Sequence, residues 1–137
     1  MCVFKSNKDK MGHRIAEKNI TCYKVMLNYY YPGNVNAYKS LVYSGKPYFN
    51  GDEMMPDKEK TVAQLDKTKY VRGGVIYSYA TRGTAYEACM SYNRIVPPLY
   101  QNAVIVKCVI PKGTSYWVSN DDQTYISMKL KIIGRVK

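Results

Sequence analysis

The last third of the chain, residues 103–137, constrains the fold most strongly, because it carries the longest apolar run and the clearest alternation. Ala103–Ile110 is rich in β-branched residues and holds one charge, which predicts a central strand buried on both faces. Pro111–Gly113 should end this strand, and Tyr116–Val118 should form the next one. From Thr124 to Ile132 apolar and polar residues alternate, which predicts one continuous strand with a dry and a wet face. The dry face would comprise Thr124, Ile126, Met128, Leu130 and Ile132, and the wet face Tyr125, Ser127, Lys129 and Lys131.

Two earlier segments also have the composition of strands. Ile20–Leu27 is largely apolar apart from Lys24, and a charge inside an apolar strand must reach an edge, a partner or a ligand. Gly73–Ala80 has similar aromatic and β-branched content and indicates a further strand. Residues 28–50 are rich in tyrosine and broken by proline and glycine, so we expect a loop there, with one short strand or helical turn near residues 39–43.

Two segments favour helices. A polar helix should occupy Pro56–Lys67, with proline in the first turn. A second helix, Ala85–Asn93, should begin at Thr84, because a glutamate follows three residues later in the spacing of a capping box. A helix start offers backbone N–H groups and partial positive charge, so Arg82 and Gly83 beside it form a candidate anion cradle. A purely structural helix start is the alternative.

The chain is strongly basic and unusually rich in tyrosine. Lysine and arginine total 21 against 10 acidic residues, which gives a net charge of +11, and most of this excess lies after residue 66. An anionic partner is the natural inference, with lysines that only solvate strand edges as the alternative. Fifteen tyrosines favour half-wet surfaces on which bases or sugars stack, although tyrosine also suits ordinary strands.

Several functional classes lack the residues that they need. The four cysteines have no CxxC spacing and the chain has one histidine, so neither a zinc site nor a Ser-His-Asp or Cys-His arrangement is expected. No glycine-rich phosphate motif occurs, and we expect no cofactor. Cys22, Cys89 and Cys108 lie in apolar segments, as reduced cytosolic thiols do. The sequence shows no signal peptide and no apolar run of about 18 residues, so we expect a soluble cytoplasmic protein without membrane contact.

Three segments carry a resemblance to a known family. ITCYKV at Ile20–Val25, GVIYSYA at Gly74–Ala80 and VKCVIPKGTSYW at Val106–Trp117 together resemble small uncharacterised proteins of gut Bacteroidales and their phages. This resemblance implies a phage protein in the host cytoplasm that sequesters a nucleotide signal of host immunity. More distantly, the order of segments is similar to ADP-ribosyltransferase-like folds, where Lys24 and Ser78–Thr81 would stand in nucleotide-binding places. No glutamate follows Glu87 to fill the catalytic place of those folds.

These patterns predict an α+β fold with a twisted, largely antiparallel sheet and two or three helices. Residues 19–137 should form a single domain, preceded by a basic flexible arm over residues 1–18. The predicted function is non-catalytic binding of a small anionic ligand, by preference a nucleotide. The predicted ligand-binding residues are Tyr23, Lys24, Tyr77, Ser78, Tyr79, Arg82, Gly83, Lys107 and Trp117.

Within this set, Tyr77, Tyr79 and Trp117 would stack on the ligand. Phosphate would be neutralised by the three cations, Lys24, Arg82 and Lys107. Two alternatives remain: DNA or RNA binding by a basic, tyrosine-rich surface, and an unusual or degenerate ADP-ribosyltransferase-like enzyme. A homo-oligomer is also left open.

Overall fold

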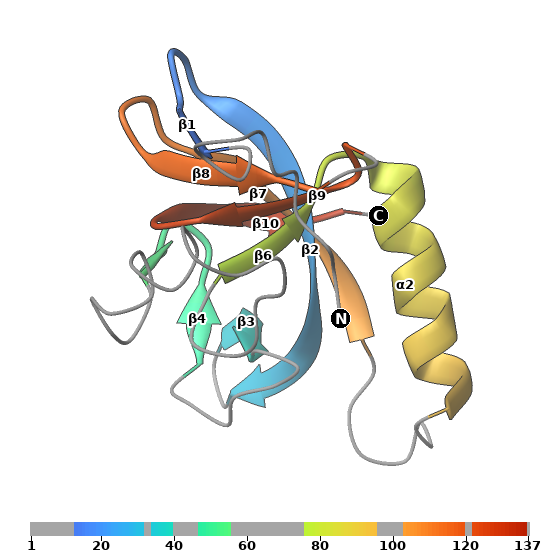
Figure 1. Cartoon of the computed structure of the whole chain (residues 1–137). Helices are drawn as coiled ribbons and strands as arrows, with labels where there is room; N and C mark the ends of the chain where they lie inside the picture. Colours follow the sequence, from blue (N-terminus) through green and yellow to red (C-terminus); the bar gives the residue numbers. More distant parts are fainter. Residues whose placement is uncertain are drawn as a thin grey trace.

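The computed structural model describes residues 13–31, 34–39, 47–55, 76–95, 103–119 and 122–136. In this part of the chain ten strands form one sheet, and one helix packs against it (Figure 1). The helix is α2 (Arg82–Ile95). The strands are β1 (His13–Ile15), β2 (Ile20–Tyr31), β3 (Asn34–Lys39), β4 (Tyr48–Phe49), β5 (Glu53–Met54), β6 (Ile76–Tyr79), β7 (Ala103–Ile110), β8 (Ser115–Val118), β9 (Thr124–Ser127) and β10 (Leu130–Arg135).

Every strand pair in the sheet is antiparallel, which confirms the predicted antiparallel architecture with a helix. The main path runs β1-β8-β9-β6-β2-β7-β10-β5, while β3 pairs with β2 and β4 with β3. The expected number of helices differs, since the described residues contain α2 alone rather than two or three helices. The polar helix expected over Pro56–Lys67 lies outside the described residues. No helix in the described ranges is long and apolar enough to cross a membrane.

The pair β2–β7 forms the centre of the sheet. Its register runs without a break from Ile20 opposite Ile110 to Leu27 opposite Ala103. Strand β7 has the bounds that its β-branched run predicts, and one of its faces is fully buried. On the other face Lys107 is exposed, so the expected burial on both faces is wrong at this position. The physical reason is that α2 covers that face of β7 only near Ala103 and Ile105.

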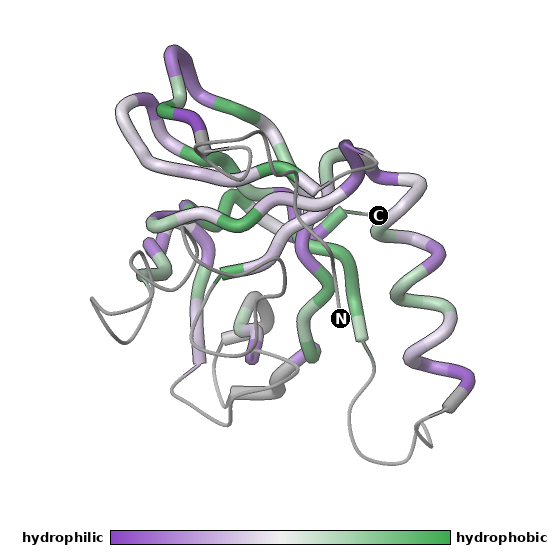
Figure 2. Tube along the Cα trace, in the orientation of Figure 1, coloured by the Kyte–Doolittle hydropathy of each residue, from purple (hydrophilic) through white to green (hydrophobic). Residues whose placement is uncertain are grey.

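The two faces of the sheet pack differently. One face, which we call the core face, carries Cys22 of β2 and Cys108 of β7 in a cluster that also includes Tyr116 of β8 and Met54 of β5. Because residues from both ends of the strand order meet in this cluster, the sheet curves around it. The other, helix-side face carries Val25, on which α2 packs through its own apolar residues. Figure 2 shows apolar segments concentrated in the central strands, while α2 alternates between hydrophilic and apolar positions.

Helix α2 begins at Arg82, three residues before the expected start. The backbone N–H of Thr84 donates to the side-chain oxygen of Thr81 at 3.2 Å, which makes Thr81 the N-cap. The capping box predicted for Thr84 and Glu87 is therefore wrong, because a threonine three residues earlier already caps the helix. Thr84 lies in the first turn, and its hydroxyl donates instead to Oε1 of Gln123 at 2.6 Å.

The continuous strand predicted from Thr124 to Ile132 is also wrong. The chain turns a corner at Met128 and Lys129, so that β9 pairs with β6 and β8 while β10 pairs with β7 and β5. The corner reverses the alternation, because each strand takes its orientation from different neighbours. Ser127, on the predicted wet face, is completely buried, while Leu130 is buried as predicted.

Two segments read as irregular from the sequence contain strands. The expected flexible arm is described from His13 onward, and there β1 pairs with β8 while Ala16 is buried. Residues 13–15 thus belong to the sheet, and Ala16 packs in the core. Strand β2 continues to Tyr31 and pairs with β3 where the composition predicts a loop. Residues 40–43 of the predicted short element, and residues 1–12 of the arm, lie outside the described residues.

Candidate functional site

A row of side chains crosses four strands on the helix-side face. Tyr23 of β2 lies opposite Lys107 of β7 on one side and opposite Tyr79 of β6 on the other. Tyr79 in turn lies opposite Thr124 of β9. Directly opposed residues in antiparallel strands point to the same face and lie roughly 5 Å apart. Three predicted ligand-binding residues, Tyr23, Tyr79 and Lys107, are therefore neighbours, although 28 to 84 positions separate them along the chain.

The start of α2 lies at the Thr124 end of this row. The N–H of Ala80 donates to the carbonyl of Gln123 at 2.9 Å, and the Thr84 hydroxyl donates to the same residue's side chain at 2.6 Å. These two contacts fix the helix start against the residue that precedes Thr124. Arg82 and Gly83, both exposed, are the first residues of the helix. The structure thus brings a further two predicted residues to the row.

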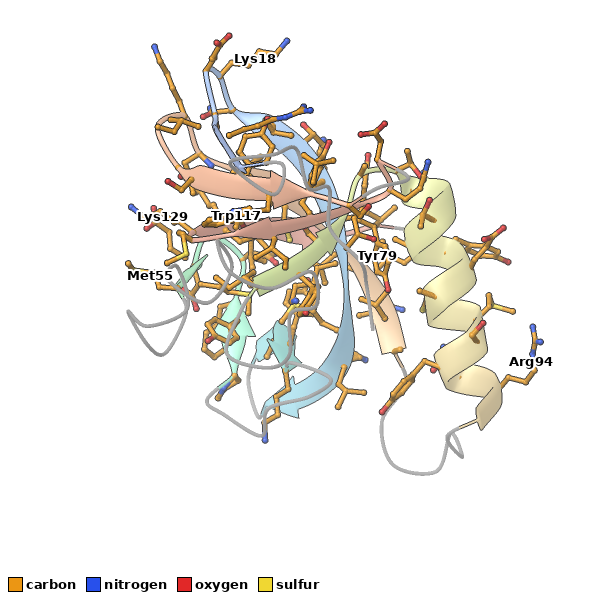
Figure 3. All side chains as sticks on the ribbon, viewed as in Figure 1. Lys18, Met55, Tyr79, Arg94, Trp117 and Lys129 are labelled. Carbon is orange, nitrogen blue, oxygen red and sulfur yellow. The ribbon has the colours of Figure 1, made fainter. Side chains whose placement is uncertain are left out.

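The row is partly covered and partly open. Tyr23 and Tyr79 are half-buried and pack beside the cluster that α2 forms with Val25, and Figure 3 shows Tyr79 on the side of the sheet that α2 covers. Lys107 and Arg82 are exposed. Two cations beside half-exposed aromatic rings can bind an anionic group and the flat body attached to it. In the described part of the chain, no group of three or more histidine, cysteine or acidic side chains could hold a metal ion.

Lys24 and Ser78 lie on the opposite face. Lys24 alternates with Cys22 and Met26, which belong to the core-face cluster, and its Nζ donates to the carbonyl of Tyr77 at 2.7 Å. Among the described residues, β2 and β6 pair at Tyr23 and Tyr79, so this bond adds a second tie between the two strands. Removal from water lowers the pKa of the Lys24 ammonium. Lys24 is therefore a bridge within the sheet, not a neighbour of Lys107.

The thiol of Cys22 lies in the same buried surroundings. Burial raises its pKa to about 11, with Ser78 and Lys24 beside it acting in the opposite direction. Burial also raises the pKa of Cys108, which lies opposite Cys22 in the register. Both thiols therefore stay protonated at neutral pH, and the expectation that they are buried and reduced agrees with the free, buried cysteines of the structure.

Three further predicted residues, Trp117, Ser78 and Tyr77, differ in how far their side chains are exposed. Trp117 is only 1% exposed and Ser78 is 0% exposed, so neither offers its side chain to a ligand. Tyr77 is half-buried, and its side chain shares the helix-side face with Tyr79. The nine predicted residues thus divide between two faces and do not line one pocket.

Two residues that the sequence patterns do not indicate, Asn93 and Gln123, hold α2 in place through polar contacts. Asn93 of α2 donates through Nδ2 to the Ala103 carbonyl at 3.1 Å and accepts the Ala103 N–H through Oδ1 at 2.8 Å. This pair holds the end of α2 on the first residue of β7. Gln123, which holds the helix start, lies 39 residues from Thr84. Local pattern carries no signal for either contact, because an isolated asparagine or glutamine resembles any turn residue.

Comparison with known proteins finds no match: no protein-family model, no curated protein and no solved structure is significantly similar to this chain.

Proposed function

We propose that the protein binds a small anionic ligand, by preference a nucleotide, without chemical conversion, on the helix-side face beside the start of α2. The observation that carries the proposal is the register that aligns Lys107, Tyr23 and Tyr79 next to Arg82. Cations and aromatic rings from four separate segments meet on one surface, and this combination suits a charged group attached to a flat ring.

Each residue has a defined role in this proposal. The Arg82 guanidinium forms a charge-assisted, two-pronged hydrogen bond to phosphate, and Gly83 allows the backbone of the first turn to approach it. Lys107 supplies a second positive charge at the far end of the row. The exposed parts of the Tyr23 and Tyr79 rings provide the surface on which a base or sugar lies. The family resemblance implies sequestration of a nucleotide signal, and sequestration requires only binding of this kind, without a catalytic step.

Direct binding to DNA or RNA is the second candidate, favoured by the net charge of +11. The two candidates differ in their dependence on salt. Affinity for a long nucleic acid falls steeply with salt, because each neutralised phosphate releases a counterion. A small nucleotide releases few counterions and should compete well with any polymer. An ADP-ribosyltransferase-like activity has less support, since Lys24 and Ser78 face away from the row that holds Arg82 and Lys107.

The first experiment is native mass spectrometry of the protein purified from cells, where a bound nucleotide appears as a fixed mass increment and the subunit number is read at the same time. Calorimetry with the co-purified nucleotide then compares wild type with Arg82→Ala and Lys107→Ala. Loss of a hydrogen bond to a charged group costs about 1.5–3 kcal/mol, so each variant should bind about ten to a hundred times more weakly.

Arg94→Ala is the matched control, because Arg94 is an exposed arginine in the last turn of α2, at the opposite end of the helix from Arg82. It should bind like wild type, and all three variants should melt within a few degrees of wild type, since exposed cations contribute little to folding. Unchanged affinity of Arg82→Ala and Lys107→Ala would contradict the proposed site. Tight binding to duplex DNA that mononucleotides fail to displace would contradict the proposed ligand class.

A further inference from the structure

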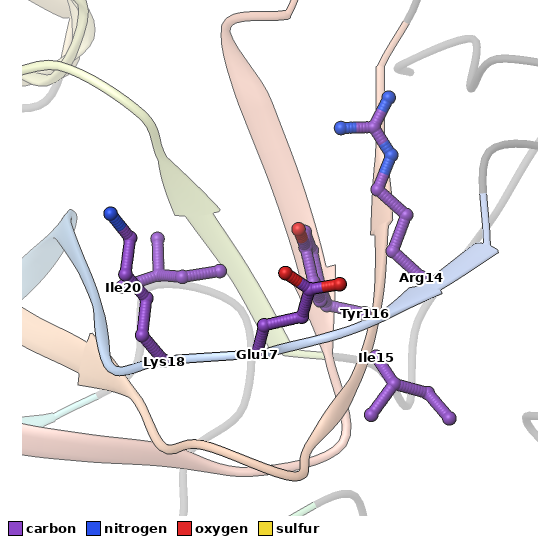
Figure 4. A pocket seen from close by; sticks show the side chains of 6 residues that line it. All are labelled: Arg14, Ile15, Glu17, Lys18, Ile20 and Tyr116. Atoms are coloured by element: carbon purple, nitrogen blue, oxygen red, sulfur yellow. The ribbon is translucent and has the colours of Figure 1, made fainter.

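A second surface, separate from the row on the helix-side face, surrounds a groove of about 660 Å³ at the β1 end of the sheet (Figure 4). Its lining residues are Arg14, Ile15, Glu17, Lys18, Ile20 and Tyr116. Ligand sites in proteins commonly measure roughly 300–1,000 Å³, so the groove has room for a mononucleotide. Sequence reasoning placed most of these residues in a flexible arm and therefore missed the groove.

Backbone contacts hold the floor of the groove in place. Between β1 and β2, Ala16 donates its N–H to the Thr114 carbonyl at 3.0 Å and accepts the Gly113 N–H at 2.8 Å. Asn19 accepts the Lys112 N–H through Oδ1 at 2.9 Å. The residues that line the groove thus flank a segment tied at both ends to the turn between β7 and β8. A groove fixed in this way loses little entropy when a ligand binds.

Tyr116 is the aromatic wall of the groove. Its ring meets the ring of Tyr125 edge to face, with 5.8 Å between centroids and an interplanar angle of 87°. Arg14 lies directly opposite Tyr116 in the β1–β8 register. The ring is therefore held by a neighbour from β9 and has a guanidinium beside it on the same face of the sheet.

The groove combines both signs of charge with apolar walls. Glu17 and Tyr116 both line the groove, and in the view of Figure 4 the Glu17 carboxylate lies in front of Tyr116, with Arg14 and Lys18 on either side of it. Ile15 is 60% exposed and Ile20 is half-buried, and the two side chains supply the apolar walls. A ligand that suits these surroundings has a flat ring, an anionic group and hydrogen-bond donors aimed at a carboxylate.

We propose that this groove binds a guanine nucleotide, with the base on Tyr116 and Glu17 and the phosphate on Arg14. An ionised carboxylate only accepts hydrogen bonds, and it accepts two of them side by side. Among the bases, guanine alone presents two adjacent N–H donors on its pairing edge, while adenine and cytosine each place a ring acceptor beside their amine. The Arg14 fork matches phosphate in the same two-pronged manner, and Lys18 adds a second positive charge.

The test is calorimetry on the full chain with GMP, AMP and inorganic phosphate as probes. GMP should bind at least about tenfold more tightly than AMP, because AMP leaves a carboxylate oxygen facing an acceptor. Glu17→Gln keeps the size of the side chain but replaces one acceptor by a donor, so it should abolish the preference for GMP and leave phosphate binding unchanged. Arg14→Ala should weaken GMP and AMP alike by about tenfold or more.

Arg94→Ala, at an exposed arginine of α2 outside both the groove and the row, is the control, and it should leave the preference for GMP intact. Glu17 and Arg14 are exposed, so thermal melting should show that both variants fold like wild type.

A single-stranded oligonucleotide with a terminal guanosine tests whether the guanine comes from a free nucleotide or from the end of a nucleic acid. If the groove takes nucleic-acid ends, Glu17→Gln should lower the affinity for this oligonucleotide. Equal binding of GMP and AMP to wild type, or a preference that survives Glu17→Gln, would overturn the assignment.

Discussion

Ser127→Asp tests the corner between β9 and β10 more directly than any other substitution. Straight alternation from Thr124 places Ser127 and Lys131 on the same wet face, whereas the structure buries Ser127 completely and leaves Lys131 exposed. Ser127 lies opposite Ile76 and Tyr116, which both pack in the core-face cluster. A carboxylate at this position would lose its hydration and gain apolar neighbours.

The magnitude follows from the pKa that such a carboxyl group would have. Full burial raises the pKa of an aspartate by about 3 units or more, and each unit costs about 1.4 kcal/mol in the ionised state. Ser127→Asp should therefore lower the free energy of unfolding by about 4 kcal/mol near neutral pH, with about 1–3 kcal/mol more for the added atoms. Lys131→Asp would place the same carboxylate in water opposite Glu53, and should cost less than about 1 kcal/mol through like-charge repulsion.

The assay is urea denaturation of both variants and of Ser127→Ala, which removes only the hydroxyl and should stay within about 1 kcal/mol of wild type. Because the new carboxyl has a raised pKa in the folded state, its cost is absent below the unfolded pKa of about 3.9 and grows as pH rises. Ser127→Asp should accordingly regain stability relative to wild type at about pH 4, even if it fails to fold near neutrality. Equal losses for Ser127→Asp and Lys131→Asp at neutral pH would refute the corner and restore the straight strand.

Two further predictions concern the helix start and the buried thiols. Thr81→Ala should lower the free energy of unfolding by about 1 kcal/mol through loss of the N-cap, while Glu87→Ala should change it by less than about 0.5 kcal/mol; the reverse order in thermal melts would favour the cap at Thr84. Since the pKa of Cys22 rises from 9.0 to about 11 on folding, stability should fall as pH rises between these two values, because only the unfolded chain releases the proton. Cys22→Ala should flatten this decline in denaturation under reducing conditions, and an unchanged slope would show that the thiol is not desolvated.

Part of this protein is determined by sequence within a few residues of each position. The β-branched run of Ala103–Ile110 gave the bounds of β7, and the apolar start of Ile20–Leu27 gave the first part of β2, because strand propensity and periodicity act locally. The presence of helix α2 between β6 and β7 was also predictable, although its start was not. Thr81 and Thr84 are both acceptable caps by residue type. The structure decides for Thr81, whose side chain accepts the Thr84 N–H, while the Thr84 hydroxyl donates to Gln123.

Pairing across the sheet was decided by tertiary structure alone. Nothing in the sequence near Tyr23 states that Lys107 lies on one side of it and Tyr79 on the other, and a shift of one residue in either register would turn the row to the opposite face. The same holds for Lys24, whose charge the sequence reveals but whose acceptor, the Tyr77 carbonyl, lies 53 residues away. Register depends on hydrogen bonds and packing between distant segments, and residue type at one position carries no information about them.

The corner at Met128 and Lys129 shows the limit most clearly. Alternation over nine residues is a strong local signal for a strand, and it does correctly mark every position from Thr124 to Ser127 and from Leu130 to Ile132 as extended. It cannot show that β9 and β10 lie on opposite sides of β2, because that follows from which neighbours complete the curved sheet around its core. The sequence therefore determined where the chain is extended, while the closing of the sheet around one buried cluster determined which side of each strand meets water.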